Sequence, residues 1–268
     1  MKMQAILVLF LFCGCLGQIN EYRQEAHDVI ENKMEEGTVA LEFETYNGNI
    51  EIHVWEKDSY RIEVKKWVYA FSKEKAEERI KKINVEFKEE EKALLLNIKL
   101  PKDLMNSGAD IEAYIPKRIF NTIRLQTYNG HIGTETVEAS HIVLKTFNGN
   151  IEANLKGSVI EIETFNGEVK GTFSGAEVSI QTFNGEIDGE CRGEGRYDVK
   201  TSNGKIKILT TGDFGFDLDT SNGSLLVTAG EVTYTLNEKK HKKGYTSDPA
   251  AIFIKASTTN GSIEIIKK

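Results

Sequence analysis

One six-residue pattern, Thr-X-Asn-Gly-X-(Ile/Val/Leu), occurs eight times in this chain and constrains its fold more than any other feature. The first copy begins at Thr45, and the other seven lie between Thr127 and Ile263. Within this second region, successive asparagines are 19, 18, 18, 19, 19 and 38 residues apart. A fixed period of this length is typical of proteins that stack one small β unit on the next. The last gap spans two periods, so we expect one coil that lacks the motif, with an insertion at residues 237–249.

Each period is expected to form a strand, an Asn-Gly corner and a second strand. Apolar residues alternate with polar ones before the corner, as at Ile160 and Ile162, and Val169 after the corner falls on the same side. We expect Asn and Gly at the corner because both tolerate positive φ. Stacked coils would also align the asparagines, whose amides can then hydrogen-bond along the axis. The predicted corner residues are Asn129, Gly130, Asn148, Gly149, Asn166, Gly167, Asn184, Gly185, Asn203, Gly204, Asn222, Gly223, Asn260 and Gly261.

These features predict an all-β chain. Residues 121–268 are expected to form a right-handed parallel β-helix, or β-solenoid, with coils of 18–19 residues. A series of antiparallel hairpins is the alternative, because Asn-Gly between alternating segments is also a strong hairpin signal. Residues 37–120 are predicted to form a β-rich segment with one helix at 73–83, for which Ser72 is the expected N-cap.

The N-terminus has the features of an export signal. Lys2 precedes an apolar segment from Ala5 to Leu16, which is shorter than the roughly 20 residues that span a bilayer. Residues 1–14 are therefore predicted to be a signal peptide. Gly14 directly before Cys15 resembles the lipobox of prokaryotic lipoproteins, and this resemblance implies cleavage before Cys15 and its lipid modification. Residues 15–36 would then be a lipidated N-terminus and polar tether; an ordinary cleaved signal and a short uncleaved anchor are the alternatives.

Motifs that carry catalytic chemistry are absent from the sequence. We find no phosphate-binding loop, nucleophile elbow, zinc-protease helix or dinucleotide fingerprint. The five histidines have no ligand-like spacing, and Cys191 is predicted to be a small buried residue. We therefore predict no catalytic residues, no metal and no cofactor. The net charge of −7 also argues against a nucleic-acid partner, since such proteins usually carry a basic stripe.

The second position of the motif is the main candidate for partner binding. It is aromatic in four successive periods and small and polar in the next three. Strand alternation predicts that these side chains point outward and form an apolar ladder that could stack on sugar rings or dock a partner. Alternatively, the corner turns them inward or the segment 37–116 covers them. The aromatic candidates are Tyr128, Phe147, Phe165 and Phe183, followed by Ser202, Ser221 and Thr259.

A second candidate is the basic segment Lys239–Lys243, with the sequence KKHKK. Anionic lipid head groups or wall polymers are ligands of the expected charge for it. A solvated loop is the simpler interpretation.

The serial motifs, with DIEAYIPKRI (Asp110–Ile119) before them, resemble the candidate-adhesin family of bacterial and archaeal surface proteins, a domain of unknown function. The resemblance covers roughly Gly37 to Lys268. It implies a β-solenoid of the cell envelope, with a link to envelope stress and no catalytic residues to transfer.

The expected function is a non-enzymatic adhesin-like or scaffold protein. It would be exported and lipid-anchored at the outer face of the cytoplasmic membrane, where it would present the solenoid to an envelope glycan or another surface protein. One alternative is a carbohydrate-active β-helix enzyme that uses scattered carboxylates. The other is a self-assembling structural element, because the ends of a solenoid expose unpaired strand edges unless they are capped.

Overall fold

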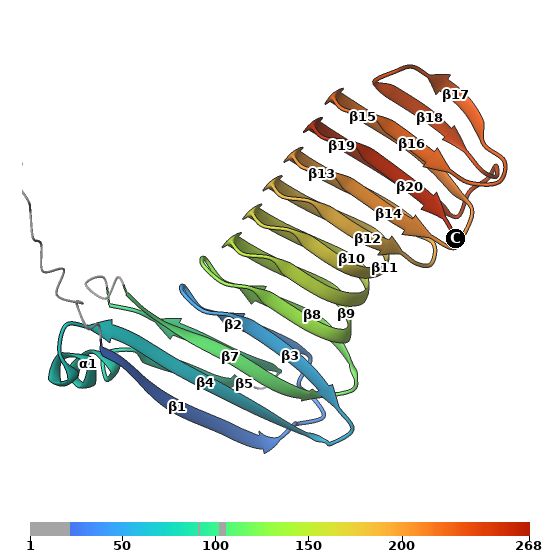
Figure 1. Ribbon diagram of the computed structural model, residues 1–268. Coiled ribbons are helices and arrows are strands. Elements are labelled where there is room, and N and C mark those ends of the chain that lie inside the picture. The colour runs from blue at the N-terminus through green and yellow to red at the C-terminus, as the bar shows by residue number, and fades with distance from the viewer. Residues whose placement is uncertain (1–21, 91, 102–105) are drawn as a thin grey trace, which may run out of the picture.

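The computed structural model describes residues 22–90, 92–101 and 106–268, which form twenty strands and one helix. Figure 1 shows a stack of bent coils formed by the C-terminal half of the chain, and a broader sheet with the helix at the N-terminal end. Hydrogen-bonded strands connect the two parts into one sheet. The predicted all-β class is confirmed.

The elements are numbered along the chain. The N-terminal part holds β1 (Tyr22–Lys33), β2 (Ala40–Glu44), β3 (Ile50–Trp55), β4 (Ser59–Ala70), α1 (Lys73–Ile80), β5 (Asn84–Glu90), β6 (Ala93–Lys99) and β7 (Ser107–Pro116). The middle coils hold β8 (Ile119–Gln126), β9 (Ile132–Asn148), β10 (Ile151–Asn166), β11 (Val169–Asn184), β12 (Ile187–Cys191), β13 (Gly195–Asn203) and β14 (Ile206–Thr210). The remaining strands are β15 (Phe214–Asn222), β16 (Leu225–Thr228), β17 (Thr233–Asn237), β18 (His241–Tyr245), β19 (Ile252–Asn260) and β20 (Ile263–Lys267).

Successive coils pair in parallel and in register. Strand β10 pairs with β11 along nearly its whole length, from Ile151 opposite Val169 to Asn166 opposite Asn184. Strand β9 pairs with β10 in the same way, with one irregularity near Ala153. A hairpin series would make these pairs antiparallel. The predicted solenoid is therefore confirmed, and the alternative of hairpin repeats is wrong.

Both arms of each coil direct their apolar side chains inward. Ile160 and Ile162 before the corner and Val169 after it are buried, as strand alternation predicts. The motif threonine lies on the same side and is also buried, so its hydroxyl needs a partner. In Thr164 that hydroxyl donates to the carbonyl oxygen of Gly149, the corner glycine of the neighbouring coil, at 2.9 Å. The threonine therefore ties each corner to the next.

The corners need glycine because adjacent coils stack closely. The expected reason, a positive φ, was wrong for most of the corner glycines. No non-glycine residue in the described part of the chain has positive φ, and of the corner glycines only Gly48 has it, at 149°. A Cβ built on Gly167 would lie 1.9 Å from the carbonyl oxygen of Gly149. The corresponding atoms at Gly149, Gly185 and Gly204 meet the same obstacle at the same distance. Only a residue without a side chain allows the corners to approach this closely.

The corner asparagines form the predicted amide ladder. Each side-chain Nδ2 donates to the Oδ1 of the asparagine in an adjacent coil, for example from Asn166 to Asn148 at 2.8 Å. Asn47 also belongs to this ladder, since it accepts from Asn129 at 2.7 Å although 82 residues separate them. In space the order is Asn47, Asn129, Asn148, Asn166, Asn184, Asn203, Asn260 and Asn222.

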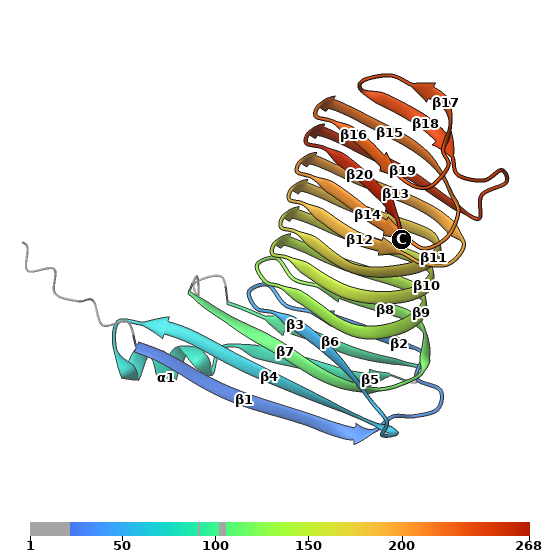
Figure 2. The same ribbon diagram turned by 45° about the vertical axis from the view of Figure 1, so that its right-hand side comes forward.

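The last coil of the sequence is not the last coil of the stack. Strand β19 lies between β13 and β15, and β20 lies between β14 and β16, all in parallel pairs (Figure 1). The coil expected between Asn222 and Asn260 does not form. The intervening chain contains the hairpin β17–β18, and β18 pairs antiparallel with the outer edge of β15. Figure 2 shows this hairpin at the end of the stack farthest from α1. It covers the strand edge of the last coil on this arm.

The N-terminal part differs from expectation in one respect. Residues Tyr22–Lys33, predicted as part of a polar tether, form strand β1, which pairs antiparallel with β4 over its full length. Val29 is 54% exposed and Ile30 packs partly buried against the core, so the charged composition reflects a strand with a solvated face. The expected helix is present as α1, and the Ser72 side chain accepts from the Lys75 backbone N–H at its N-terminus. The predicted signal peptide and Cys15 lie outside the described residues.

Candidate functional site

The second motif positions form an outward-facing stack of five rings. The rings of Tyr46, Tyr128, Phe147, Phe165 and Phe183 follow one another with centroids 4.9, 4.8, 4.8 and 4.7 Å apart, and neighbouring planes differ by at most 6°. We call these five residues the aromatic ladder. Their side chains are exposed, so the alternatives in which the corner or the segment 37–116 buries them are wrong.

The spacing of the ladder follows from the strand pairing. Parallel strands in register place equivalent residues about 4.8 Å apart, which matches the centroid distances. Each inner ring is therefore covered on both faces by its neighbours, and it presents only its edge to solvent. The exposed fraction reflects this arrangement: 52% for Tyr46 and 45% for Phe183 at the ends, against 37% for Phe147 in the middle.

Sequence reasoning placed four rings in the ladder and missed Tyr46. Its motif is 82 residues before the next one, and the two coils become neighbours through the pairing of β2 with β8 and of β3 with β9. The signal was present, because the Thr45 motif has the same aromatic variant as the others. Beyond Phe183 the ladder ends, and the second motif position is occupied by small residues in the spatial order Ser202, Thr259 and Ser221.

Polar side chains run parallel to the ladder, two residues before each of its five rings and before Ser202, and the same position continues along the stack with Ser257 and Asp219. We call the six residues Glu44, Gln126, Lys145, Glu163, Gln181 and Lys200 the polar row. The only ion pair between its members in the described part of the chain joins Lys145 Nζ to Glu163 Oε2 at 2.9 Å. Lys200 binds Asp198 at 2.9 Å on its own strand. The row therefore carries both signs of charge beside an apolar stripe.

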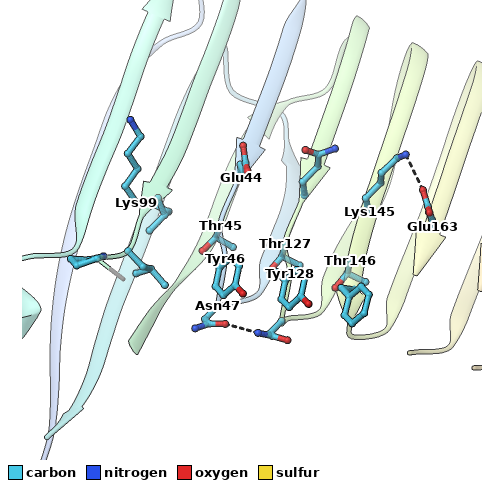
Figure 3. A pocket seen from close by; sticks show the side chains of 16 residues that line it. Glu44, Thr45, Tyr46, Asn47, Lys99, Thr127, Tyr128, Lys145, Thr146 and Glu163 are labelled. Atoms are coloured by element: carbon cyan, nitrogen blue, oxygen red, sulfur yellow. Dashed lines mark hydrogen bonds and ion pairs between the residues drawn. The ribbon is translucent and has the colours of Figure 1, made fainter. Parts of the chain in front are cut away.

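The ladder and the polar row line a shallow groove. Its wider end has a volume of about 1120 Å³ and lies between the first rings and the end of β6, where Ile98, Leu100 and Pro101 add apolar surface. Figure 3 shows this end, with Tyr46, Tyr128 and Thr146 on adjacent strands and the bonded pair Lys145–Glu163 above them. A second depression of about 590 Å³ continues along the same face past Phe165 and Phe183 to Ser202.

Groups with strongly shifted pKa values lie away from this groove. Burial raises the pKa of the Cys191 thiol, which confirms the prediction of a small buried residue. Burial also raises the pKa of Tyr197 and of Tyr60, each to about 12. No group of three or more His, Cys, Asp or Glu residues in the described ranges is arranged to hold a metal ion. The described residues also contain no helix with the length and apolar character needed to cross a bilayer.

The basic segment Lys239–Lys243 contributes to the cap of the solenoid. His241 Nε2 lies 2.7 Å from Asp217 Oδ1 on β15, and Lys243 reaches the same carboxylate at 3.9 Å. Lys240 Nζ donates to the carbonyl oxygen of Gly223 at 2.8 Å. Through these contacts the basic segment binds β15 and the corner that follows it. The interpretation as a solvated loop is therefore incomplete.

Several solved structures and one family model are similar to this chain. A candidate lipid-binding protein from Parabacteroides distasonis has a TM-score of 0.47 and 14% identity, over 90% of this chain and 97% of that one. A candidate cell adhesion protein from Clostridium sporogenes has a TM-score of 0.33 and 14% identity, over 92% and 100%. A candidate adhesin from Bacteroides fragilis has a TM-score of 0.36 and 10% identity, over 90% and 97%. No curated protein matches the chain. Residues 38–266 match the Toastrack DUF4097 domain, a domain of unknown function, and the protein therefore belongs to the Toastrack DUF4097 family.

Proposed function

We propose that this chain is a non-enzymatic binding protein of the cell surface and that the aromatic ladder docks its partner. The observation that carries the proposal is the outward stack of rings from Tyr46 to Phe183 on a series of aligned coils. A contiguous exposed apolar surface rimmed by polar residues is typical of interaction sites on soluble proteins. Coils held by in-register pairing and by the amide ladder keep such a surface rigid, which lowers the entropy lost on binding.

The ladder favours a protein partner over a glycan. A sugar that stacks on an aromatic side chain needs an open ring face. Within the ladder, only Tyr46 and Phe183 have a face that no other ladder ring covers. A protein surface can instead pack apolar side chains against the ring edges along the whole length.

We predict that the double variant Phe147→Ser/Phe165→Ser loses binding and keeps its fold. Serine occupies the same motif position at Ser202 and Ser221, so the solenoid accepts it there. Two aromatic contacts worth about 1–2 kcal/mol each correspond to an affinity loss of about 30-fold or more. The measurement is biolayer interferometry of the purified chain against immobilised neutral and acidic glycans, wall polymers and the chain itself.

The matched control is Leu226→Ser, because Leu226 is 51% exposed but lies on β16, in the arm after the corner. It should bind like the unchanged chain. Equal binding by the ladder variant and the unchanged chain would refute the ladder as the docking surface. Turnover of a glycan that stops after substitution of Glu44, Glu163 or Asp219, the carboxylates that line the groove, would replace the proposal with the enzymatic alternative.

The proposal includes export and a lipid anchor at Cys15 on the outer face of the cytoplasmic membrane. It is supported by the apolar segment before Cys15 and by the small residue Gly14 at the cleavage position. We predict that Cys15→Ser moves the chain from the membrane fraction to the soluble fraction, as measured by fractionation and immunoblotting. Membrane retention equal to that of the unchanged chain would rule out the anchor, and Cys13→Ser is the control.

A further inference from the structure

The polar row has an order that is complementary to its own reverse. In spatial sequence it is Glu44, Gln126, Lys145, Glu163, Gln181 and Lys200. When the row is aligned with its own reverse, each glutamate lies opposite a lysine, each lysine opposite a glutamate, and each glutamine opposite a glutamine. A row with this order fits a second copy of itself that runs in the opposite direction.

A face-to-face arrangement of two copies uses this order. A two-fold axis parallel to the strands, between the coils of Phe147 and Phe165, places ladder on ladder and polar row on polar row. Glu44 then faces Lys200 of the second copy, and Gln126 faces its Gln181. In the ladders, Phe147 meets Phe165 of the second copy. The bulky Tyr46 meets the small Ser202.

We propose that the partner of the ladder is a second copy of this chain, docked face to face with its coils running in the opposite direction. This inference rests on the proposed function, since it names the occupant of the same surface. Both the charges and the apolar edges are self-complementary in one register, as an isologous interface requires. The hairpin β17–β18 covers the edge of β15, so association through this face runs sideways and not by stacking coils end to end.

The size of the contact predicts weak association. Six coils at about 4.8 Å each and a width of two rows give an area on the order of 350 Å² per copy, against about 800 Å² for a stable interface. The next row outward would bring Glu42 opposite Asp198 of the second copy, and these like charges confine the contact to the two inner rows. Lys145 and Glu163, already paired within each copy, would form an alternating cluster of four charges.

Site-specific cross-linking tests the register. The full chain is prepared as two variants, Gln126→Cys and Gln181→Cys, with Cys13 and Cys15 changed to serine and Cys191 protected by burial. A short bismaleimide is added to each variant alone and to their mixture. Covalent dimer should appear in the mixture and be lost when both chains also carry Phe147→Ser/Phe165→Ser. The background is a mixture of Gln126→Cys with Leu226→Cys, which lies on the other arm.

Two results would overturn the inference. Dimer at the background level in the mixture would mean that the second copy does not dock here. Equal dimer from Gln126→Cys alone would mean that any contact has a different register. Neither result bears on the proposed function. If the unchanged chain binds a glycan, wall polymer or other probe and the ladder variant does not, the ladder is a docking surface even though its partner is not a second copy.

Discussion

Replacing Gly167 with alanine should unfold the solenoid at a markedly lower temperature. The added Cβ would lie 1.9 Å from the Gly149 carbonyl oxygen, and that oxygen cannot move because it also accepts the Thr164 hydroxyl. Overpacking against fixed backbone should cost about 3 kcal/mol or more. For a chain of this size, such a loss lowers the melting temperature by about 6–12 °C. Thermal unfolding followed by circular dichroism measures the shift.

Gly230→Ala is the matched control. A Cβ at Gly230 meets no atom within 4 Å, so the same substitution should leave the melting temperature nearly unchanged. Because Gly167 does not have positive φ, strain in the alanine backbone cannot account for a difference between the two variants. Equal melting temperatures would mean that the corners are not packed as closely as described.

Removing the chain after Pro249 should disrupt the end of the stack far more than loss of a terminal coil would. The deletion removes β19 and β20, which lie between the coil of β13–β14 and that of β15–β16. Four buried isoleucines, at about 1.5–3 kcal/mol each, contribute on the order of 10 kcal/mol. This is comparable with the total stability of about 5–15 kcal/mol expected for a domain. The isoleucines are Ile252, Ile254, Ile263 and Ile265.

Limited proteolysis with mass spectrometry checks this prediction. Cleavage should spread over residues 214–245, which the deletion leaves without a partner coil. A milder test in the full chain compares Ile265→Ser, which is fully buried, with Ile266→Ser, which is half-buried on the same strand. A truncated chain that melts like the full chain and resists protease at β15 would contradict the inserted position of the last coil.

Most of the architecture could be predicted from the repeat. The 18–19-residue period, the alternation around Ile160 and Ile162 and the Asn-Gly corners predicted parallel coils, an amide ladder and outward aromatic side chains. These features are local, since each depends on residues within one coil and on the regular step to the next. The buried Cys191 and the N-cap at Ser72 were predictable for the same reason.

The order of the coils came only from the tertiary structure. All eight motifs are nearly identical, so any coil could stack on any other, and local pattern cannot say that Asn47 lies beside Asn129 or that Asn260 lies between Asn203 and Asn222. The same is true of β1, whose polar sequence becomes a strand because β4 offers it an edge.

Sequence alone therefore determined the coil: its length, its corner and the side of the strand on which each residue lies. The tertiary structure decided which coils are neighbours, and therefore which residues lie side by side in the amide ladder and the aromatic ladder. It explained the corner glycines by the carbonyl oxygen of the adjacent coil, and it added Tyr46 to the ladder. The tertiary structure also covers both faces of each inner ring, because parallel strands in register bring each ring within stacking distance of the next.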